Sequence, residues 1–312
     1  MSKPALAYVG LAVNGIDAAT SALADLLRLP SRDAVLGDGT RVPLLRVGDT
    51  ALALFEAGHP CLGSDSKPGV HHVAIAADAP DAYAAAQGLP LDEQCPEAGI
   101  DGVAQRGFAP SATCGVRLRV CEPLALPGTG GGEVERIDHL GVASTDNANA
   151  TEVFSRRLGC PVESTQTDME VRMAVESFTS DKYGVVYHSR PPEPVGGHRV
   201  SILSIGDGEL EFLQPCDPAP DRADDSAPAP GRPGNTRGDR GAIGRYIERR
   251  GPGLHHIALK TPDINRLLPE LAGRGLRMID LEGRPGSRRA LIGFVHPAAL
   301  GGVLLHFVQR DE

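Results

Sequence analysis

The chain has 312 residues, which is enough for two domains of ordinary size. Apolar residues make up 41% and charged residues 23%, as in a typical globular protein, and no apolar run approaches the ~18 residues that a membrane span needs. The formal net charge of −9 and the absence of tryptophan argue against nucleic acid as a partner, because that role needs clustered cations and aromatic stacking.

We therefore expect a cytoplasmic protein that binds a small-molecule substrate and neither a membrane nor a nucleic acid. The first residues, MSKPALAYVGLAV, are too short and too glycine-interrupted for a signal peptide and are predicted to form a first strand. The six cysteines include no Cys-X-X-Cys pair, so we interpret them as scattered thiols.

Four related units follow one another along the chain. In each unit an alternating strand is followed by an amphipathic helix and then by several strands separated by turn residues. The units span roughly 5–58, 69–123, 135–216 and 252–310. The internal match is plainest between 68–86 and 252–271, where a Pro-Gly turn, a His-His pair, a strand and an acidic helix start recur in the same order.

The units pair into two predicted domains, residues 1–125 and 135–312. The Gly-rich stretch 126–134 between them is predicted to be a linker. The third unit has extra residues at about 165–195, which are predicted to form an additional hairpin or an extended pair of strands. The segment 216–241 is rich in Pro, Asp, Arg and Gly and is predicted to be a long surface loop.

Four side chains that commonly bind metal ions occupy matching places in units three and four. His139 and His256 lie in the leading strands, and Glu211 and His306 lie in the last strands. Both last-strand residues are flanked by apolar neighbours, where a polar side chain costs free energy unless it has a partner. Imidazole and carboxylate groups bind Zn, Fe, Ni, Co and Mn well, so the joint placement predicts one divalent metal site.

The first half provides an internal control for this prediction. The corresponding positions there are Tyr8, Ala53, His72 and Arg119, of which only His72 could bind a metal. We therefore expect the first half to keep the fold without a metal site, and His72 to be structural.

Three segments of the second half carry a resemblance to a known family: IDHLGVA (137–143), GRYIERRGPGLHHIALKTPDI (244–264) and FVHPAALGGVLLHFVQ (294–309). They resemble the vicinal oxygen chelate superfamily, which contains glyoxalases, bleomycin resistance proteins and dioxygenases. The second half is most similar to methylmalonyl-CoA epimerases. The resemblance implies an α+β fold of four βαβββ modules, arranged as two domains with cupped mixed sheets, the first of them degenerate.

The resemblance also implies that the four predicted ligands hold one divalent ion, which binds vicinal oxygens of the substrate. The implied function is a metal-dependent isomerase, epimerase or lyase that acts on a small oxygenated acid or acyl thioester through an enolate-like anion. The sequence departs from its relatives at His306, where they have Glu in a GGVLIEL-type strand. A neutral ligand there would strengthen the ion as a Lewis acid and remove a proton acceptor.

In these relatives a carboxylate moves the substrate proton. The candidates for that role here are Glu170, Glu176, Glu193 and His198, although an exposed strand or loop residue is the simpler interpretation of each.

Two other functions compete with this interpretation. A non-haem Fe(II) dioxygenase of the extradiol or 4-hydroxyphenylpyruvate type would use two His and Glu211, with His306 as an additional ligand. A non-catalytic small-molecule binding protein is the second alternative, although such members usually lack a full ligand set. Two modules per half complete a cup, so the chain is compatible with a monomer or a homodimer.

Overall fold

The computed structural model describes residues 3–63, 66–128, 132–172, 175–180, 182, 184–189, 193–216 and 241–310. Almost all of the predicted surface loop at 216–241, and residues 129–131 of the predicted linker, lie outside this described part. No helix within the described residues is long and apolar enough to cross a membrane.

The first half of the chain forms a seven-stranded mixed sheet with the strand order β2-β3-β4-β1-β5-β7-β6. Its central strands, β1 and β5, are antiparallel, and each pairs in parallel with the last strand of its own unit. The strands are β1 (Ala5–Val13), β2 (Ser31–Val35), β3 (Arg41–Val47), β4 (Thr50–Glu56), β5 (Gly69–Ala76), β6 (Gln105–Phe108) and β7 (Leu118–Cys121).

The second half repeats this plan in an eight-stranded sheet with the order β15-β16-β17-β14-β8-β13-β12-β9. Again the two leading strands, β8 and β14, are antiparallel at the centre, and each pairs in parallel with a last strand. The strands are β8 (Arg136–Ala143), β9 (Val162–Arg172), β12 (Glu193–Ile205), β13 (Gly208–Cys216), β14 (Gly253–Lys260), β15 (Arg284–Pro285), β16 (Leu291–Phe294) and β17 (Leu305–Gln309).

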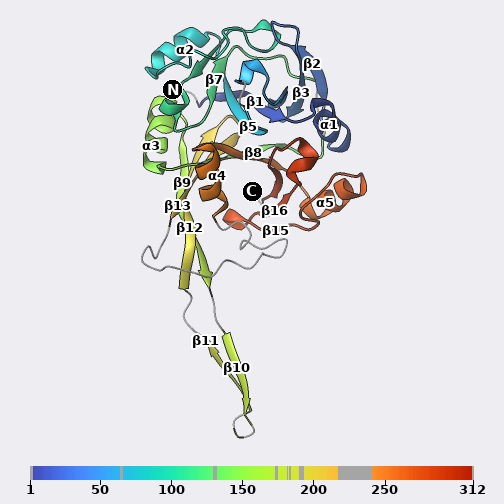
Figure 1. Cartoon of the computed structure of the whole chain (residues 1–312), viewed down its shortest axis with the longest axis vertical. Helices are drawn as coiled ribbons and strands as arrows, with labels where there is room; N and C mark the ends of the chain where they lie inside the picture. The colour runs from blue at the N-terminus through green and yellow to red at the C-terminus, as the bar shows by residue number, and fades with distance from the viewer. Residues whose placement is uncertain are drawn as a thin grey trace.

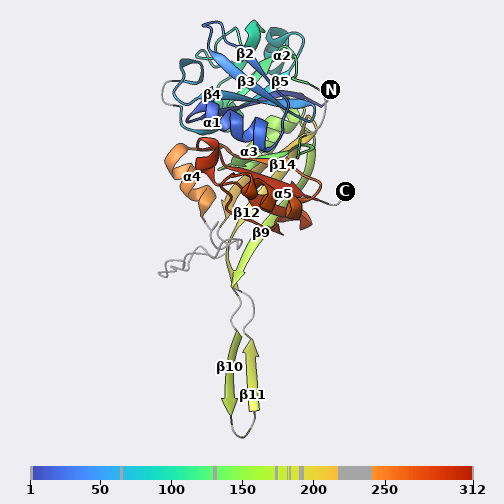
Figure 2. The same cartoon turned by 90° about the vertical axis from the view of Figure 1, so that its right-hand side faces the viewer.

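The predicted extra hairpin is present as β10 (Val175–Ser180) and β11 (Gly184–Ser189), which pair only with each other. Together with the extended ends of β9 and β12 they form a ribbon that projects away from both sheets (Figure 1). The view turned by 90° shows the same projection, with the first-half sheet at the opposite end of the molecule (Figure 2).

The helices are short. They are α1 (Ile16–Ser21) continued by the π-helix η1 (Ala22–Leu26), α2 (Pro80–Gln87), α3 (Asn147–Thr151) continued by the π-helix η5 (Glu152–Arg157), α4 (Ala242–Arg250) and α5 (Ile264–Gly273). Helices α1, α2, α3 and α5 follow the leading strands of their units, whereas α4 precedes β14. Single 3₁₀ turns are η2 (Pro60–Leu62), η3 (Ile100–Gly102), η4 (Pro110–Thr113), η7 (Ser287–Arg289) and η8 (Pro297–Leu300). Asp146 and Asp263 cap α3 and α5 by accepting the backbone N–H three residues later, which explains the acidic helix starts in the sequence.

The predicted fold class is confirmed: two mixed sheets carry strand–helix–strand modules in tandem. The second module is reduced, because the strand expected after α2 consists of the single bridge between Leu91 and Phe108. A continuous apolar cluster joins the two halves, and backbone hydrogen bonds from Asn14 to Gly301 and from Gly206 to Pro4 add to their contact. The boundaries of the predicted domains and their linker stay predictions.

The packing of Phe212 should matter most on the helix-covered face of the second sheet. Its ring is fully buried and lies 5.1 Å from that of Phe154. Phe212→Ala should lower the free energy of unfolding by about 3–5 kcal/mol, because it opens a cavity that the rigid sheet cannot collapse. Leu281→Ala, at an exposed site in the same half, should change it by less than about 0.5 kcal/mol. Urea unfolding of the two variants measures the difference; equal losses would contradict this account of the core.

Candidate metal centre

The four predicted ligands lie on four adjacent strands of the second sheet. In the order of the strands they are Glu211 on β13, His139 on β8, His256 on β14 and His306 on β17. Glu211 and His256 both lie opposite Gly141 of β8, and His139 and His306 both lie opposite Ala258 of β14. The register therefore places all four side chains on one face of the sheet, across the two central strands.

The side chains converge on a small buried volume. Nε2 of His139 lies 3.4 Å from Nε2 of His256 and 3.5 Å from Oε2 of Glu211. The Glu211 oxygen is 3.9 Å from Nε2 of His256, and one ligand nitrogen from each histidine, His306 included, lies within 4.8 Å of the others. All four residues are buried. Three imidazoles and one carboxylate at these spacings form a donor set suited to one divalent ion.

Two β-bulges and a glycine allow this convergence. Asp138 on β8 and His255 on β14 are the extra residues of the bulges, so each shares the face of the histidine that follows it. The ring of His256 lies directly over Gly141, where a Cβ atom would stand 2.0 Å from the ring. Only glycine leaves room for this ring between His139 and Glu211.

The bulged residues orient the two central histidines through their Nδ1 atoms. Asp138 accepts a hydrogen bond of 2.6 Å from Nδ1 of His139 and one of 2.5 Å from Arg310. Nδ1 of His255 lies 2.9 Å from Nδ1 of His256. Each contact leaves Nε2 turned toward the cluster, as in the carboxylate–histidine pairs of metal sites.

The electrostatics favour neutral imidazoles at His256 and His306 and a charged carboxylate at Asp138. Burial, and after it the neighbouring histidines, lower the pKa of His256 well below its ordinary value, and burial does the same for His306. Burial alone would raise the pKa of Asp138, but the hydrogen bond from His139 and the positive charges of His139 and Arg310 outweigh it, so that the pKa falls to about 2. Neutral imidazole is the form that binds metal ions.

One buried atom in the cluster has no partner among the described residues. Nδ1 of His306 is fully enclosed and makes no hydrogen bond. The ring itself stacks on Phe294 at 4.6 Å and faces the rings of His139 and His256 at 5.1 Å each. Three buried imidazoles with so few hydrogen bonds are costly without a further ligand, so the residues present fit a divalent ion.

The corresponding positions of the first sheet hold a different cluster. The same bulge recurs at His71, and the ring of His72 lies over Gly10 as that of His256 lies over Gly141. There Nε2 of His72 faces the hydroxyl of Tyr8 at 3.2 Å, and Arg119 donates a hydrogen bond to the carbonyl of Cys61. The position of Glu211 is taken by the buried Ala53, so this sheet lacks the carboxylate.

The structure separates the candidates for proton transfer. Glu176 lies on β10 in the projecting ribbon, and Glu193 begins β12 nine residues before Ile202, the partner of Glu211. At about 3.3 Å per residue that separation is roughly 30 Å along the strand, so the structure does not bring Glu176 or Glu193 to the cluster. The backbone of Glu170 likewise pairs with Gly196, toward the ribbon end of the sheet.

The strand register places His198 on the face of the cluster. It lies on β12 in unbroken alternation with Ile202, which pairs with Glu211. Its charge also acts on the imidazole of His255, whose pKa falls to about 4 through burial, Arg250 and His198.

Several neighbours of the cluster were not singled out in the sequence. Strict strand alternation would place Asp138 and His255 on the face opposite the cluster, so the sequence pattern does not predict their position. Glu209 is two residues before Glu211 and is held by Arg288 at 3.0 Å and by Arg310 at 3.6 Å. The acidic residue directly before His139 and the doubled His255-His256 pair were the available signals.

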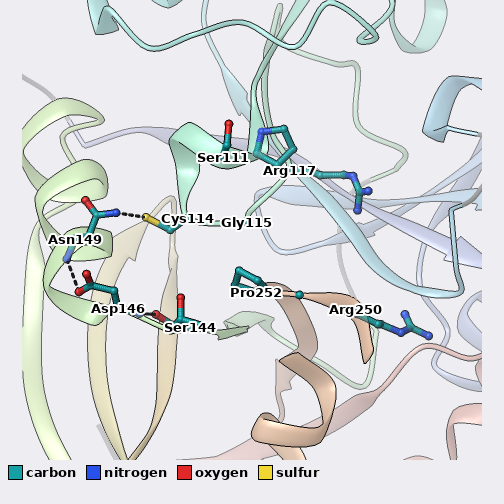
Figure 3. A pocket seen from close by; sticks show the side chains of 12 residues that line it. Ser111, Cys114, Gly115, Arg117, Ser144, Asp146, Asn149, Arg250 and Pro252 are labelled. Carbon is teal, nitrogen blue, oxygen red and sulfur yellow. Dashed lines mark hydrogen bonds between the residues drawn. The ribbon is translucent and has the colours of Figure 1, made fainter. Parts of the chain in front are cut away.

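A cavity of about 440 Å³ lies elsewhere, between the two halves. Figure 3 shows Arg117 and Arg250 on one side of it and Asp146 and Asn149 on the other. The side-chain amide of Asn149 donates a hydrogen bond to the sulfur of Cys114. Asp146 already caps α3, and none of the four predicted ligands lines this cavity. It is therefore a feature of the contact between the halves, separate from the metal cluster.

Comparison with known proteins agrees with this geometry. The family model of the glyoxalase/bleomycin resistance protein/dioxygenase superfamily matches residues 138–294, which is half of the chain. The chain belongs to this superfamily. The match begins one residue before His139 and includes Glu211 and His256, and it ends before His306.

Two relatives and one solved structure extend the comparison. The mitochondrial methylmalonyl-CoA epimerases of Dictyostelium discoideum and Bos taurus are 28% and 23% identical over 135 and 121 residues, or 42% and 38% of this chain. The matches span 69% of the first protein and 57% of the second. A 4-hydroxymandelate synthase variant from Streptomyces coelicolor, 17% identical, aligns with all of this chain and 94% of its own with a TM-score of 0.58, and so shares the two-sheet fold.

Two matched glycine substitutions test whether the cluster binds metal through its geometry. Gly141→Ala sets a methyl group 2.0 Å from the ring of His256, and Gly10→Ala sets one 2.1 Å from that of His72. Both should destabilise the fold, but only Gly141→Ala should weaken the binding of a divalent metal. We expect a loss of affinity of about tenfold or more, as when a residue that orients a metal ligand is removed. Metal analysis of the folded variants measures this. Equal metal content in both variants would contradict the assignment.

Proposed function

We propose that the chain is a divalent-metal-dependent enzyme of the isomerase, epimerase or lyase type, acting on a small oxygenated acid or an acyl thioester. The observation that carries this proposal is the buried convergence of three histidines and one carboxylate on adjacent strands. His139, Glu211, His256 and His306 would hold the ion. When bound, the ion supplies Lewis-acid stabilisation of negative charge that develops on substrate oxygens.

The residues around the cluster favour an anionic substrate. Glu211 is the one carboxylate in the donor set, because His306 takes the place of a second. Arg288 and Arg310 lie beside it and offset the charges of Glu209 and Asp138. The side chains on this face therefore leave the positive charge of a divalent ion largely uncompensated, which suits binding of a carboxylate or an enolate-like anion.

His198 is our candidate for moving the substrate proton. It shares the face of Glu211, and its side chain is partly exposed, so a substrate proton can reach it. Glu209 is less suited, because the guanidinium groups of Arg288 and Arg310 already engage both of its carboxylate oxygens.

The relatives guide the choice of substrate. Proteins similar to the second half are named methylmalonyl-CoA epimerases, so acyl thioesters with an acidic α-proton are the first class to test. A non-haem Fe(II) dioxygenase is the second candidate, because His139, His256 and Glu211 contain the two-His, one-carboxylate set that such enzymes use. His306 would then occupy a coordination position on the iron that O₂ or the substrate would otherwise take.

Exchange of the α-proton of methylmalonyl-CoA with D₂O tests the proposal directly. Protein purified with its bound metal should catalyse the exchange. Glu211→Ala should abolish exchange together with metal binding, whereas His198→Gln should slow it by about 10²–10⁴-fold with metal content unchanged, because it removes only proton transfer. Mass spectrometry of the thioester and metal analysis of each variant give the two readouts.

The alternatives predict different results in the same preparations. Oxygen uptake with catechol or 4-hydroxyphenylpyruvate, without α-proton exchange, would replace the proposal by the dioxygenase. Tight binding of small molecules with neither reaction would indicate a binding protein.

A further inference from the structure

The first sheet borders a cavity of about 330 Å³ that is lined by Arg119, the residue at the position of His306. Its walls come from the η2 turn, β5, β6 and β7, which are the counterparts of the region around β14, β16 and β17. Arg119 on β7 lies opposite Ala74 and Gly107, as His306 on β17 lies opposite Ala258 and Phe294. The guanidinium group thus replaces the imidazole of His306.

A single difference between the sheets helps to open this cavity. The ring of Phe294 covers His306 in the second sheet, whereas Gly107 holds the matching position in the first. Gly107 has no side chain to cover Arg119, and a Cβ there would stand 2.7 Å from Cβ of Cys95. Both Gly107 and Cys95 line the cavity.

Arg119 carries a buried charge that makes no ion pair with the described residues. The residue is 9% exposed and lines the cavity. One of its N–H groups donates to the carbonyl of Cys61 at 2.9 Å, and the hydroxyl of Tyr8 is its other close polar neighbour. No carboxylate of the described residues lies within the 4.0 Å of an ion pair with it. A buried cation without a counter-ion is costly, and a guanidinium group has five donors to satisfy.

The other groups around Arg119 do not supply the missing negative charge. Burial and the nearby arginines lower the pKa of His71 to about 3, and burial raises the pKa of Cys61 to about 11. Both side chains are therefore neutral. The carboxylate of Asp92 also belongs to the lining, but it accepts a hydrogen bond from the backbone of Gln94 and makes no ion pair with Arg119. Arg117 adds a second cation to the lining and offsets the charge of Asp92.

We propose that this first-sheet cavity binds a small organic carboxylate, whose anion pairs with Arg119. A planar carboxylate matches the fork of the guanidinium group, and the side chain of Leu62, which also lines the cavity, offers an apolar contact for the carbon skeleton of an organic acid. The binding site is distinct from the metal cluster and does not depend on the function proposed for it. The repeated fold thus provides two cups, one suited to a metal ion and one that uses a fixed cation of its own.

Alkylation of Cys61 and Cys95 reports occupancy of this cavity, since both thiols line it. The full chain is treated with iodoacetamide in the presence of acetate, propionate, succinate or benzoate, and rates are read by peptide mass spectrometry. At constant ionic strength, at least one carboxylate should slow both thiols saturably, by about tenfold at ten times its Kd. Cys114, which lines the other cavity, should be unaffected and serves as the internal reference.

Matched variants and ligands make the result specific. Arg119→Met should weaken the apparent affinity by at least about tenfold, as expected for loss of a charge-assisted hydrogen-bonded pair. His306→Ala, which alters the metal cluster alone, should leave the protection unchanged. The uncharged amides of the same acids should give none.

Protection by the amides, equal protection by inorganic phosphate, undiminished protection in Arg119→Met, or no protection by any of the four acids would each overturn the proposal. If Arg119→Met does not fold, Arg119→Lys keeps the charge and loses the fork, and it should bind the carboxylate more weakly than wild type. Unchanged affinity in Arg119→Lys would likewise contradict a paired carboxylate.

Discussion

In each sheet a histidine ring lies over a glycine of the neighbouring central strand, and the arrangement of both cups depends on this contact. His72 covers Gly10 and His256 covers Gly141. In each case the residue before it is a second histidine, which forms a β-bulge and lies beside the first. The ring occupies the space that a side chain on the glycine would take. Its Nε2 is thereby held over the middle of the sheet, and the side chains of the adjacent strands decide what that nitrogen faces.

The two halves solve the resulting problem of buried polarity in different ways. In the second sheet His139, Glu211 and His306 surround His256, and the set fits a divalent cation. In the first sheet Tyr8 and Arg119 take two of those positions, so the positive charge belongs to the protein itself. The two halves thus share their backbone geometry but differ in the source of positive charge: a divalent ion suits the second sheet, and the guanidinium group of Arg119 supplies the charge in the first.

Much of the fold, and the four candidate ligands, could be predicted because the internal repeats align positions that strand pairing then brings together. His139 and His256, and Glu211 and His306, occupy equivalent places in successive units, and adjacent parallel and antiparallel pairing places them on one face. The roles of Asp138 and His255 could not be predicted, because a bulge breaks the period-two alternation on which such reasoning relies. The distance of Glu176 and Glu193 from the cluster could not be predicted either, because it depends on the length of β9 and β12, which the sequence pattern leaves open.

X-ray absorption spectroscopy of the metal-loaded chain tests the central claim most directly, because it counts the ligand types around the ion. The account predicts three imidazole ligands and at least one oxygen ligand in wild type, and two imidazoles or loss of the ion in His306→Ala. A site with fewer than three imidazoles in wild type, or a spectrum unchanged by His306→Ala, would contradict it.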